Sequence, residues 1–311
     1  MSGQFNAALW SSGGAILIAL GSCNDGKAAP NPPAPSLAAK PVSTAPAPQP
    51  LRPAPPAAPR TDFALTGEMT QGGWLQGIAP AGTIELTFDG APVPISPDGR
   101  FFIAFDRDAG AAAALSARMA SGRTVERGLT IAPRAWQIEH IPLGPRPGTP
   151  PDQNFLRRRA TETAQINAAR RINAASDGWR QNFIWPVRGR ISGRFGAQRI
   201  YPAGPAAYHS GLDIATGASG TPFVAPADGV VILAAQSPFT LEGNLLMIDH
   251  GMGLNSAFLH ASQLLVREGE SVKQGQVIGR IGMTGRATGP HLHWSLKWRA
   301  SRLDPLLFVP K

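Results

Sequence analysis

The sequence is poorest in cysteine, because Cys23 is the only one among 311 residues. A single thiol excludes both an intrachain disulfide and a structural zinc site built from cysteines. Histidine is also scarce, with six in the chain, and tyrosine is scarcer, with two. This scarcity makes the histidine positions informative, since five of the six fall between His209 and His293.

The chain also lacks an apolar run of the roughly 20 residues that a membrane-spanning helix needs. The shorter run AALWSSGGAILIALGSC, Ala7 to Cys23, fits the hydrophobic part of a secretory signal, although no Lys or Arg precedes it. Its end, LGSC, resembles a bacterial lipobox, in which the chain is cut before the cysteine and the thiol is lipidated. We therefore expect residues 1–23 to be a signal segment of a periplasmic lipoprotein held to the membrane through Cys23. Secretion to the periplasm without an anchor is the alternative.

Charged residues make up only 16% of the chain, yet the net charge is +9 and the pI is about 10.7. Such a balance favours polyanionic surroundings: nucleic acid, anionic lipid or an acidic cell-wall polymer. From Phe183 onward there are twelve Lys and Arg against seven Asp and Glu, without the basic and aromatic interleaving of nucleic-acid platforms. We expect the cell wall, and not nucleic acid, to be the partner.

Composition divides the rest of the chain into four parts. Residues 24–60 are rich in Pro and Ala, which predicts an extended, disordered tether. Residues 61–145 alternate apolar and polar positions around turn signals such as SPDG, which predicts a small β-domain. Residues 150–182 show a thin apolar stripe and many arginines, which predicts a short helical linker. Residues 183–311 return to short strands between Gly turns, which predicts an all-β, mostly antiparallel domain.

The last domain contains a histidine pair in the stretch GPHLHWSL. Alternate residues of a strand share a face, so His291 and His293 should project together, with Leu292 and Trp294 on the other side. The stretch YHSGLDIA adds His209 and Asp213. Two imidazoles and a carboxylate can hold zinc and leave a fourth position open for water, as in catalytic zinc sites.

Three stretches together, HSGLDIA, FLHAS and TGRATGPHLHWSL, resemble the signatures of the LytM/lysostaphin-type zinc endopeptidases, the M23 family of cell-wall hydrolases. The resemblance covers roughly residues 183–308 and implies an antiparallel fold that combines features of a β-sandwich and a barrel. It also implies one Zn²⁺ held by His209, Asp213 and His293. Two further histidines, His291 and His260, would then lie beside the metal-activated water as general base and electrostatic helper.

The implied activity is hydrolysis of peptide cross-links in peptidoglycan. Some relatives of this family have lost their metal ligands, so a non-enzymatic wall-binding protein or amidase activator in cell division is the alternative. Two His and one carboxylate also form the facial triad of Fe(II) oxygenases, but that chemistry leaves His260 and His291 without a role. One departure from the family is Phe258, where members usually have a tyrosine.

Overall fold

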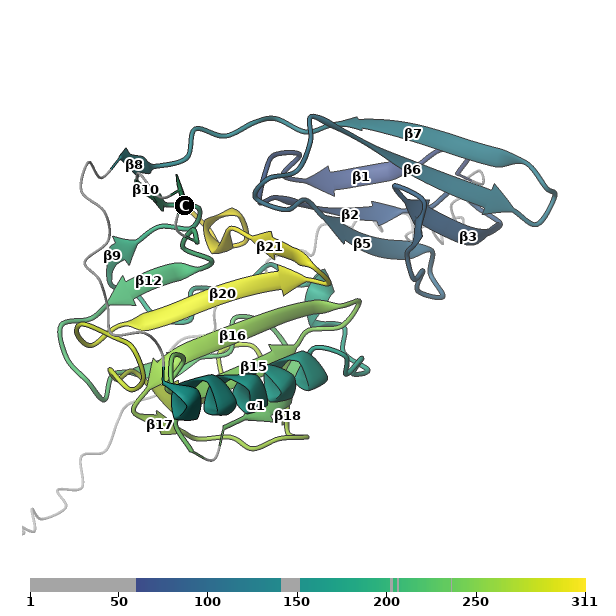
Figure 1. Cartoon of the computed structure of the whole chain (residues 1–311). Helices are drawn as coiled ribbons and strands as arrows, with labels where there is room; N and C mark the ends of the chain where they lie inside the picture. The colour runs from purple at the N-terminus through teal and green to yellow at the C-terminus, as the bar shows by residue number, and fades with distance from the viewer. Residues whose placement is uncertain (1–59, 141–151, 202–203, 206, 236) are drawn as a thin grey trace, which may run out of the picture. The chain divides into compact units, whose positions relative to one another are not determined.

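The structure is a computed structural model. It describes residues 60–140, 152–201, 204–205, 207–235 and 237–311 (Figure 1). The predicted signal, Cys23 and nearly all of the predicted tether lie outside these residues. No helix in the described part of the chain is both long and apolar enough to cross a membrane.

The N-terminal β region contains two antiparallel sheets. One has the order β1-β2-β5 and the other the order β4-β3-β6-β7. Leu86 and Leu115 are buried between exposed or partly exposed neighbours, and Phe101 to Ala104 are buried throughout, so these residues contribute to the core. The strand bounds are β1 Ala64–Gly67, β2 Trp74–Ile78, β3 Thr83–Phe88, β4 Ala91–Pro92, β5 Arg100–Ala104, β6 Ala112–Met119 and β7 Thr124–Thr130.

The C-terminal region is built on an eight-stranded sheet of order β18-β14-β15-β16-β20-β12-β9, with β21 paired to β20 (Figure 1). All pairs in this sheet are antiparallel. The strands are β9 Arg190–Gly193, β12 Leu212–Ala215, β14 Gly229–Ala234, β15 Asn244–Asp249, β16 Leu254–Ala261, β18 Ser271–Val272, β20 Leu292–Trp298 and β21 Ser301–Leu303.

Two smaller sheets complete the C-terminal region. The first has the order β13-β19-β17, and the second the order β11-β10-β8. In the second sheet β8 runs parallel to β10, so the chain leaving the N-terminal β region joins the C-terminal one as an added strand. The bounds are β8 Ile138–His140, β10 Gln198–Tyr201, β11 Gly204–Pro205, β13 Pro222–Val224, β17 Gln263–Leu264 and β19 Val277–Arg280. The predicted fold class, antiparallel β with a small N-terminal β region, is confirmed.

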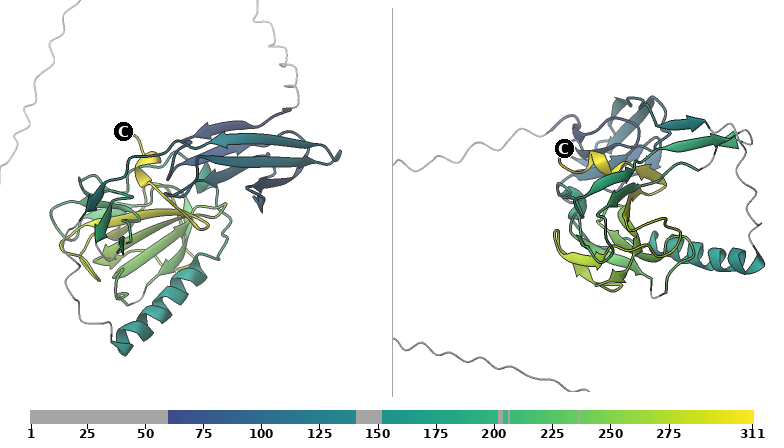
Figure 2. Two further views of the ribbon diagram at one scale, coloured as in Figure 1. Left: turned by 45° about the horizontal axis from the view of Figure 1, so that its top comes forward. Right: turned by 90° about the vertical axis from the view of Figure 1, so that its left-hand side faces the viewer.

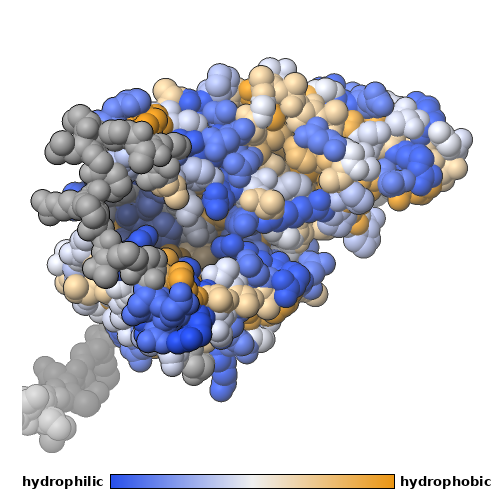
Figure 3. Space-filling model, viewed as in Figure 1, coloured by the Kyte–Doolittle hydropathy of each residue, from blue (hydrophilic) through white to orange (hydrophobic). Residues whose placement is uncertain are grey.

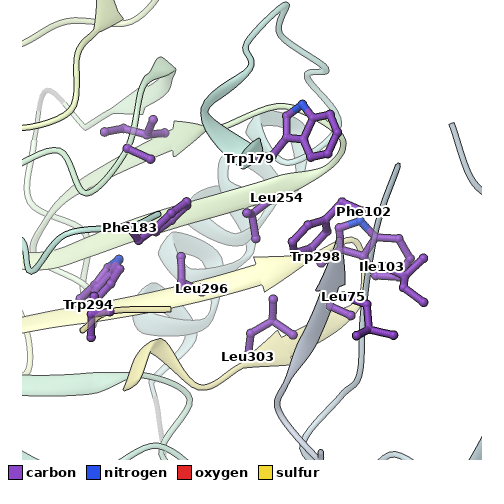
Figure 4. Packing of buried hydrophobic residues seen from close by; sticks show 14 of the residues in the cluster. Leu75, Phe102, Ile103, Trp179, Phe183, Leu254, Trp294, Leu296, Trp298 and Leu303 are labelled. Carbon is purple, nitrogen blue, oxygen red and sulfur yellow. The ribbon is translucent and has the colours of Figure 1, made fainter. Parts of the chain in front are cut away.

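Strict alternation along β20 gives the large sheet two different faces. The side chains of Leu292, Trp294, Leu296 and Trp298 are almost fully buried. Figure 4 shows three of these residues in the apolar cluster, where Trp298 lies near Phe102 of the N-terminal β region with ring centroids 6.4 Å apart. The two β regions thus share one apolar cluster, which leaves the opposite face of β20 for polar side chains.

Helix α1, Gln153–Ala169, covers part of that opposite face (Figures 1 and 2). Asp152 caps its first turn, because its carboxylate accepts a hydrogen bond from Phe155 N at 2.6 Å. Ile166 and Ala169 pack against β14, β15 and β16. The predicted apolar stripe is only partly correct, since Leu156 on the helix and Ile172 beyond it are exposed.

Of the three consecutive arginines near the start of the helix, Arg157 and Arg158 are exposed to solvent, whereas the third is only partly exposed. Arg159 instead forms a bidentate pair with Glu242 and a bond to Glu162. The chain also has two short 3-10 helices. The first, η1, Gly178–Arg180, lies between α1 and β9, and the second, η2, Pro305–Leu307, follows β21.

One histidine of the C-terminal region is structural. His250 is fully buried, and its Nδ1 donates to the Asp228 carbonyl at 2.8 Å, while its Nε2 accepts from the Ser256 hydroxyl at 2.7 Å. The same hydroxyl accepts from Trp294 Nε1 at 3.3 Å. Burial lowers the pKa of His250 to about 4, so the ring is neutral at pH 7.

This burial predicts acid destabilisation. The unfolded chain takes up a proton on His250 near pH 6.5 and the folded chain only near pH 4, so the contribution to stability is complete above pH 6.5 and is lost as the pH falls to about 4. The shift corresponds to about 3 kcal/mol. Urea unfolding in chelator at pH 7 and pH 4.5 should show His250→Gln losing less stability over this interval than wild type. Equal pH dependence of the two proteins would contradict the assignment.

Candidate metal centre

Three side chains from two separate stretches converge at the open face of β20. His293 Nδ1 lies 2.8 Å from Asp213 Oδ1, and His209 Nε2 lies 3.1 Å from each of these two atoms. Strand pairing explains the convergence, since Asp213 on β12 is the register partner of His293 on β20. His209 lies three residues before the start of β12 and four before Asp213, which brings it within reach. The structure therefore brings together the three residues predicted to bind metal.

The hydrogen bonding of His209 makes this cluster suited to a cation. Its Nδ1 donates to the Arg194 carbonyl at 3.0 Å, so a neutral ring directs the lone pair of Nε2 toward the other two donor atoms. A carboxylate oxygen and two imidazole nitrogens, all within 3.1 Å of one another, need a shared positive charge. Tetrahedral zinc with bonds of about 2.0–2.1 Å would hold its ligands about 3.3 Å apart. The donor set fits zinc.

The electrostatics of the three groups follow from this closeness. Burial opposes ionisation of Asp213, but hydrogen bonds from His209 and His293 and their charges outweigh it and lower the pKa of Asp213 far below its ordinary value. Burial also works against a charged His209, yet the Asp213 carboxylate raises the pKa of this histidine. Burial dominates at His293 and lowers its pKa. Asp213 is thus an anion at neutral pH and available as a ligand.

His260 reaches the site through an irregularity in its strand. Phe258 pairs with Leu246 and Ala261 with Asn244, so Leu259 and His260 together oppose a single residue of β15, a β-bulge. His260 has φ of 65°, a left-handed conformation that is costly for a residue other than glycine. Its ring lies 4.9 Å from that of His291 and 6.2 Å from that of His293. We infer that the bulge turns this imidazole from the core toward the metal centre.

The two histidines predicted to move protons are each held, like His209, by a hydrogen bond from Nδ1 to a backbone carbonyl. His260 Nδ1 donates to the Thr284 carbonyl at 2.9 Å, and His291 Nδ1 donates to the Gly289 carbonyl at 2.8 Å. In the neutral rings this leaves each Nε2 as a proton acceptor. His291 Nε2 lies 3.7 Å from Asp213 Oδ1, which places it beside the metal centre. Burial lowers the pKa of His260, so it is neutral at pH 7.

The cluster lies in an open groove of about 1110 Å³. In Figure 3 the hydrophilic side chains gather around a hollow on this face of the molecule. One wall includes Leu241, Glu242 and the loop at Arg286, and the other includes β10 and the stretch from Gln137 to Glu139. A groove open to solvent can admit an extended polymer, and the segment that follows the N-terminal β region forms part of its wall.

Both tyrosines also line the groove, although no sequence motif indicated that they would. The Tyr208 hydroxyl accepts a hydrogen bond from Arg302 Nη1 at 3.2 Å. Phe258, the departure from the family pattern, is fully buried and stacks on Phe223 with ring centroids 5.4 Å apart. Phe258 is therefore a core residue, and the tyrosines nearest the site lie elsewhere in the chain.

Two glycines that the sequence reasoning missed make room for the three converging side chains. A Cβ on Gly193 would lie 2.5 Å from Asp213 Oδ2 and 3.1 Å from His209 Cε1. A Cβ on Gly211 would lie 2.6 Å from His293 Nε2. Neither glycine has a positive φ, so space and not backbone conformation requires glycine there.

Arg107 of the N-terminal β region supports the backbone around His209. Its Nη2 donates to the Gly196 carbonyl at 3.0 Å, and its guanidinium stacks on Tyr208. Gly196 N in turn donates to the His209 carbonyl at 2.8 Å. This chain of contacts holds the loop whose Arg194 carbonyl anchors the His209 ring. Arg107 is a positioning residue that no sequence motif indicated.

Replacing Arg107 by methionine should therefore weaken zinc binding about tenfold, as is typical for the loss of a group that orients a metal ligand. Methionine keeps an apolar stem but removes the donors. Zinc affinity can be measured by competition with a chromophoric chelator. Arg127→Met is the matched control, because Arg127 is exposed on β7 and pairs only with Asp62 among the described residues. Equal zinc affinity of the two variants would contradict the supporting role.

Comparisons with known proteins agree with this geometry. Residues 207–305 match the model of peptidase family M23. Peptidoglycan DD-endopeptidase ShyA of Vibrio cholerae is 43% identical over 108 residues, 34% of this chain and 24% of ShyA. Murein hydrolase activator NlpD of Salmonella dublin is 33% identical over 150 residues, 48% of this chain and 36% of NlpD. This chain thus spans about a quarter to a third of the length of these relatives.

A solved structure shows similarity beyond the matched segment. A Pseudomonas aeruginosa protein crystallised as a candidate M23 peptidase aligns with a TM-score of 0.58 and 28% identity, covering 78% of this chain and 95% of that one. The alignment therefore includes more of the chain than the family match alone. The resemblance noted from the three sequence stretches is confirmed: this chain carries a LytM-type domain of peptidase family M23.

Proposed function

We propose that this protein is a zinc-dependent endopeptidase that hydrolyses peptide cross-links of peptidoglycan. The observation that carries the proposal is the convergence of His209, Asp213 and His293, with donor atoms 2.8–3.1 Å apart, beside two further histidines. The family match and the similarity to ShyA, a peptidoglycan DD-endopeptidase, support the same activity.

His209 Nε2, Asp213 Oδ1 and His293 Nδ1 would hold the zinc ion. When bound, zinc lowers the pKa of a water from 15.7 to about 7 and polarises a peptide carbonyl. With each Nδ1 bonded to a backbone carbonyl, the neutral form of either His291 or His260 offers its Nε2 as a proton acceptor beside the cluster. One of them can take the proton of the attacking water and return it to the leaving amine, while the other stabilises developing charge. The groove orients the peptide across these groups.

The test is release of soluble products from purified peptidoglycan by the full-length protein. Products should appear with added zinc, disappear with chelator and return when zinc is restored. Mass spectrometry of defined cross-linked muropeptides would identify the bond that is cut. No product from any peptidoglycan, with zinc bound, would reject the endopeptidase.

The similarity to NlpD, a murein hydrolase activator, favours a second candidate. As an amidase activator in cell division, the protein would bind a partner enzyme and need no chemistry of its own. Stimulation of a purified amidase by both wild type and His291→Ala would support this role. The intact set of site residues favours the enzyme.

We further propose that the protein works in the periplasm as a membrane-anchored lipoprotein. The proposal rests on the signal-like run and Cys23, both outside the described residues. Labelled palmitate should enter the wild type and not Cys23→Ser. Equal incorporation in the two proteins, or none in either, would reject the anchor.

A further inference from the structure

The face of β20 that carries the metal ligand His293 also carries a cluster of positive charge. Alternation places Ser295 and Lys297 on the same face as His293. Lys297 is directly opposite Arg302 in the pairing of β20 with β21. Like charges at opposite positions of an antiparallel pair repel each other and destabilise the pair. This pairing is therefore unfavourable unless an opposite charge lies beside it.

Arg170, the C-cap residue of helix α1, adds a third positive charge. Its Nε is buried and has no hydrogen-bond partner in the described part of the chain. Burial lowers the pKa of Arg170, and the charge of Arg302 lowers it further. Lys297 behaves similarly, since burial and then the charges of Arg170 and Arg302 lower its pKa. The three groups are thus close enough to interact.

The cluster has little compensating negative charge. None of the three head groups forms an ion pair with any carboxylate of the described residues. The hydrogen bond to Tyr208 raises the pKa of Arg302, and the nearby charges of Asp106 and Asp108 add to this. The Asp106 carboxylate, however, accepts the backbone N–H groups of Arg302 at 2.8 Å and Asp108 at 3.2 Å, and the Asp108 carboxylate is paired with Arg107. Glu242 is near Arg170, but it is already paired with Arg159. A bound anion would supply the missing charge.

The cluster is also connected to the groove. Arg302 is exposed and donates to the hydroxyl of Tyr208, which lines the groove next to His209. Lys297 lies four residues along the strand from His293, or about 13 Å at 3.3 Å per residue. An extended peptide bound along β20 would cover this distance with about four residues. Figure 1 shows β20 uncovered by helix α1 on this face.

We propose that Arg170, Lys297 and Arg302 form a subsite for a carboxylate of an acidic peptide whose scissile bond lies at the metal centre. This inference rests on the proposed endopeptidase function and specifies the substrate further. The substrate would be a peptide that carries a free carboxylate several residues from the bond that is cut. The subsite would contribute to binding and not to the chemical step.

The test measures binding separately from cleavage. Soluble cross-linked muropeptides are prepared with free carboxylates or as methyl esters, and their dissociation constants are measured on full-length, zinc-loaded His291→Ala. The free acid should bind about tenfold more tightly than the ester. Adding Lys297→Gln and Arg302→Gln should weaken binding of the free acid about tenfold, since hydrogen bonds between charged groups contribute at least this much. Binding of the ester should change less than twofold.

A matched control removes two positive charges elsewhere. Arg123→Gln with Arg267→Gln changes two exposed arginines in turns outside the groove and should leave both constants unchanged. In cleavage assays without the His291 change, the subsite variant should raise KM about tenfold and keep kcat within twofold. If wild type cuts nothing but the binding differences appear, the endopeptidase fails and the subsite stands. Equal binding of acid and ester by His291→Ala, or equal losses for both probes in the subsite variant, would overturn the subsite.

Discussion

Replacing His291 by alanine is expected to lower kcat for muropeptide cleavage by a factor of 10² to 10⁴ while one zinc ion per chain is retained. This range is typical for the loss of a general acid–base group. Zinc is retained because His291 is not one of the three converging donors, and its Nε2 lies 3.7 Å from Asp213 Oδ1. KM should change little. Steady-state kinetics and metal analysis of the same preparation measure the two effects.

The matched control is His140→Ala, which changes an exposed histidine on β8. It should leave kcat within twofold of wild type. If His291→Ala keeps full activity, the proton-transfer role is wrong. If it loses its zinc, His291 belongs among the ligands and the proposed division of roles fails.

Replacing Gly193 by alanine is expected to abolish zinc binding and activity together while the fold remains. Gly193 on β9 is the register partner of Asp213 on β12, and a Cβ would lie 2.5 Å from the Asp213 carboxylate. The carboxylate must then turn away, which removes one of three ligands. Equilibrium dialysis should show zinc affinity lowered at least a hundredfold, and circular dichroism should show an unchanged β spectrum.

Gly128→Ala provides the comparison for that experiment. Gly128 lies within β7, and its added Cβ would meet nothing within 4 Å. This variant should bind zinc as wild type does. Normal zinc affinity in Gly193→Ala would show that the Asp213 carboxylate has room to shift without losing its ligand geometry.

The sequence predicted the parts of the site that follow from strand periodicity. Alternation alone placed His291 and His293 on one face of a strand, and the structure shows Leu292 and Trp294 buried on the other. Residue types alone suggested His209 and Asp213 as further ligands, but the assignment of the set came from the family resemblance. Pairing between β12 and β20 is a contact over about 80 residues that local patterns do not encode.

Other features depend on tertiary structure and could not be predicted. Strict alternation would place His260 on the same face as the buried Phe258, and only the bulge in β16 brings it to the site. The ion pair of Arg159 joins it to Glu242, which lies more than 80 residues away in the sequence, so no local pattern indicates it. The support that Arg107 gives to the His209 loop likewise depends on contacts between distant segments.

The most direct test of the zinc centre is the metal content of the full-length protein, measured by mass spectrometry after purification in zinc-containing buffer and removal of loose metal. Wild type should contain one zinc ion per chain, and Asp213→Ala and His209→Ala should each contain almost none. A wild-type protein with no more zinc than these two variants would contradict the account.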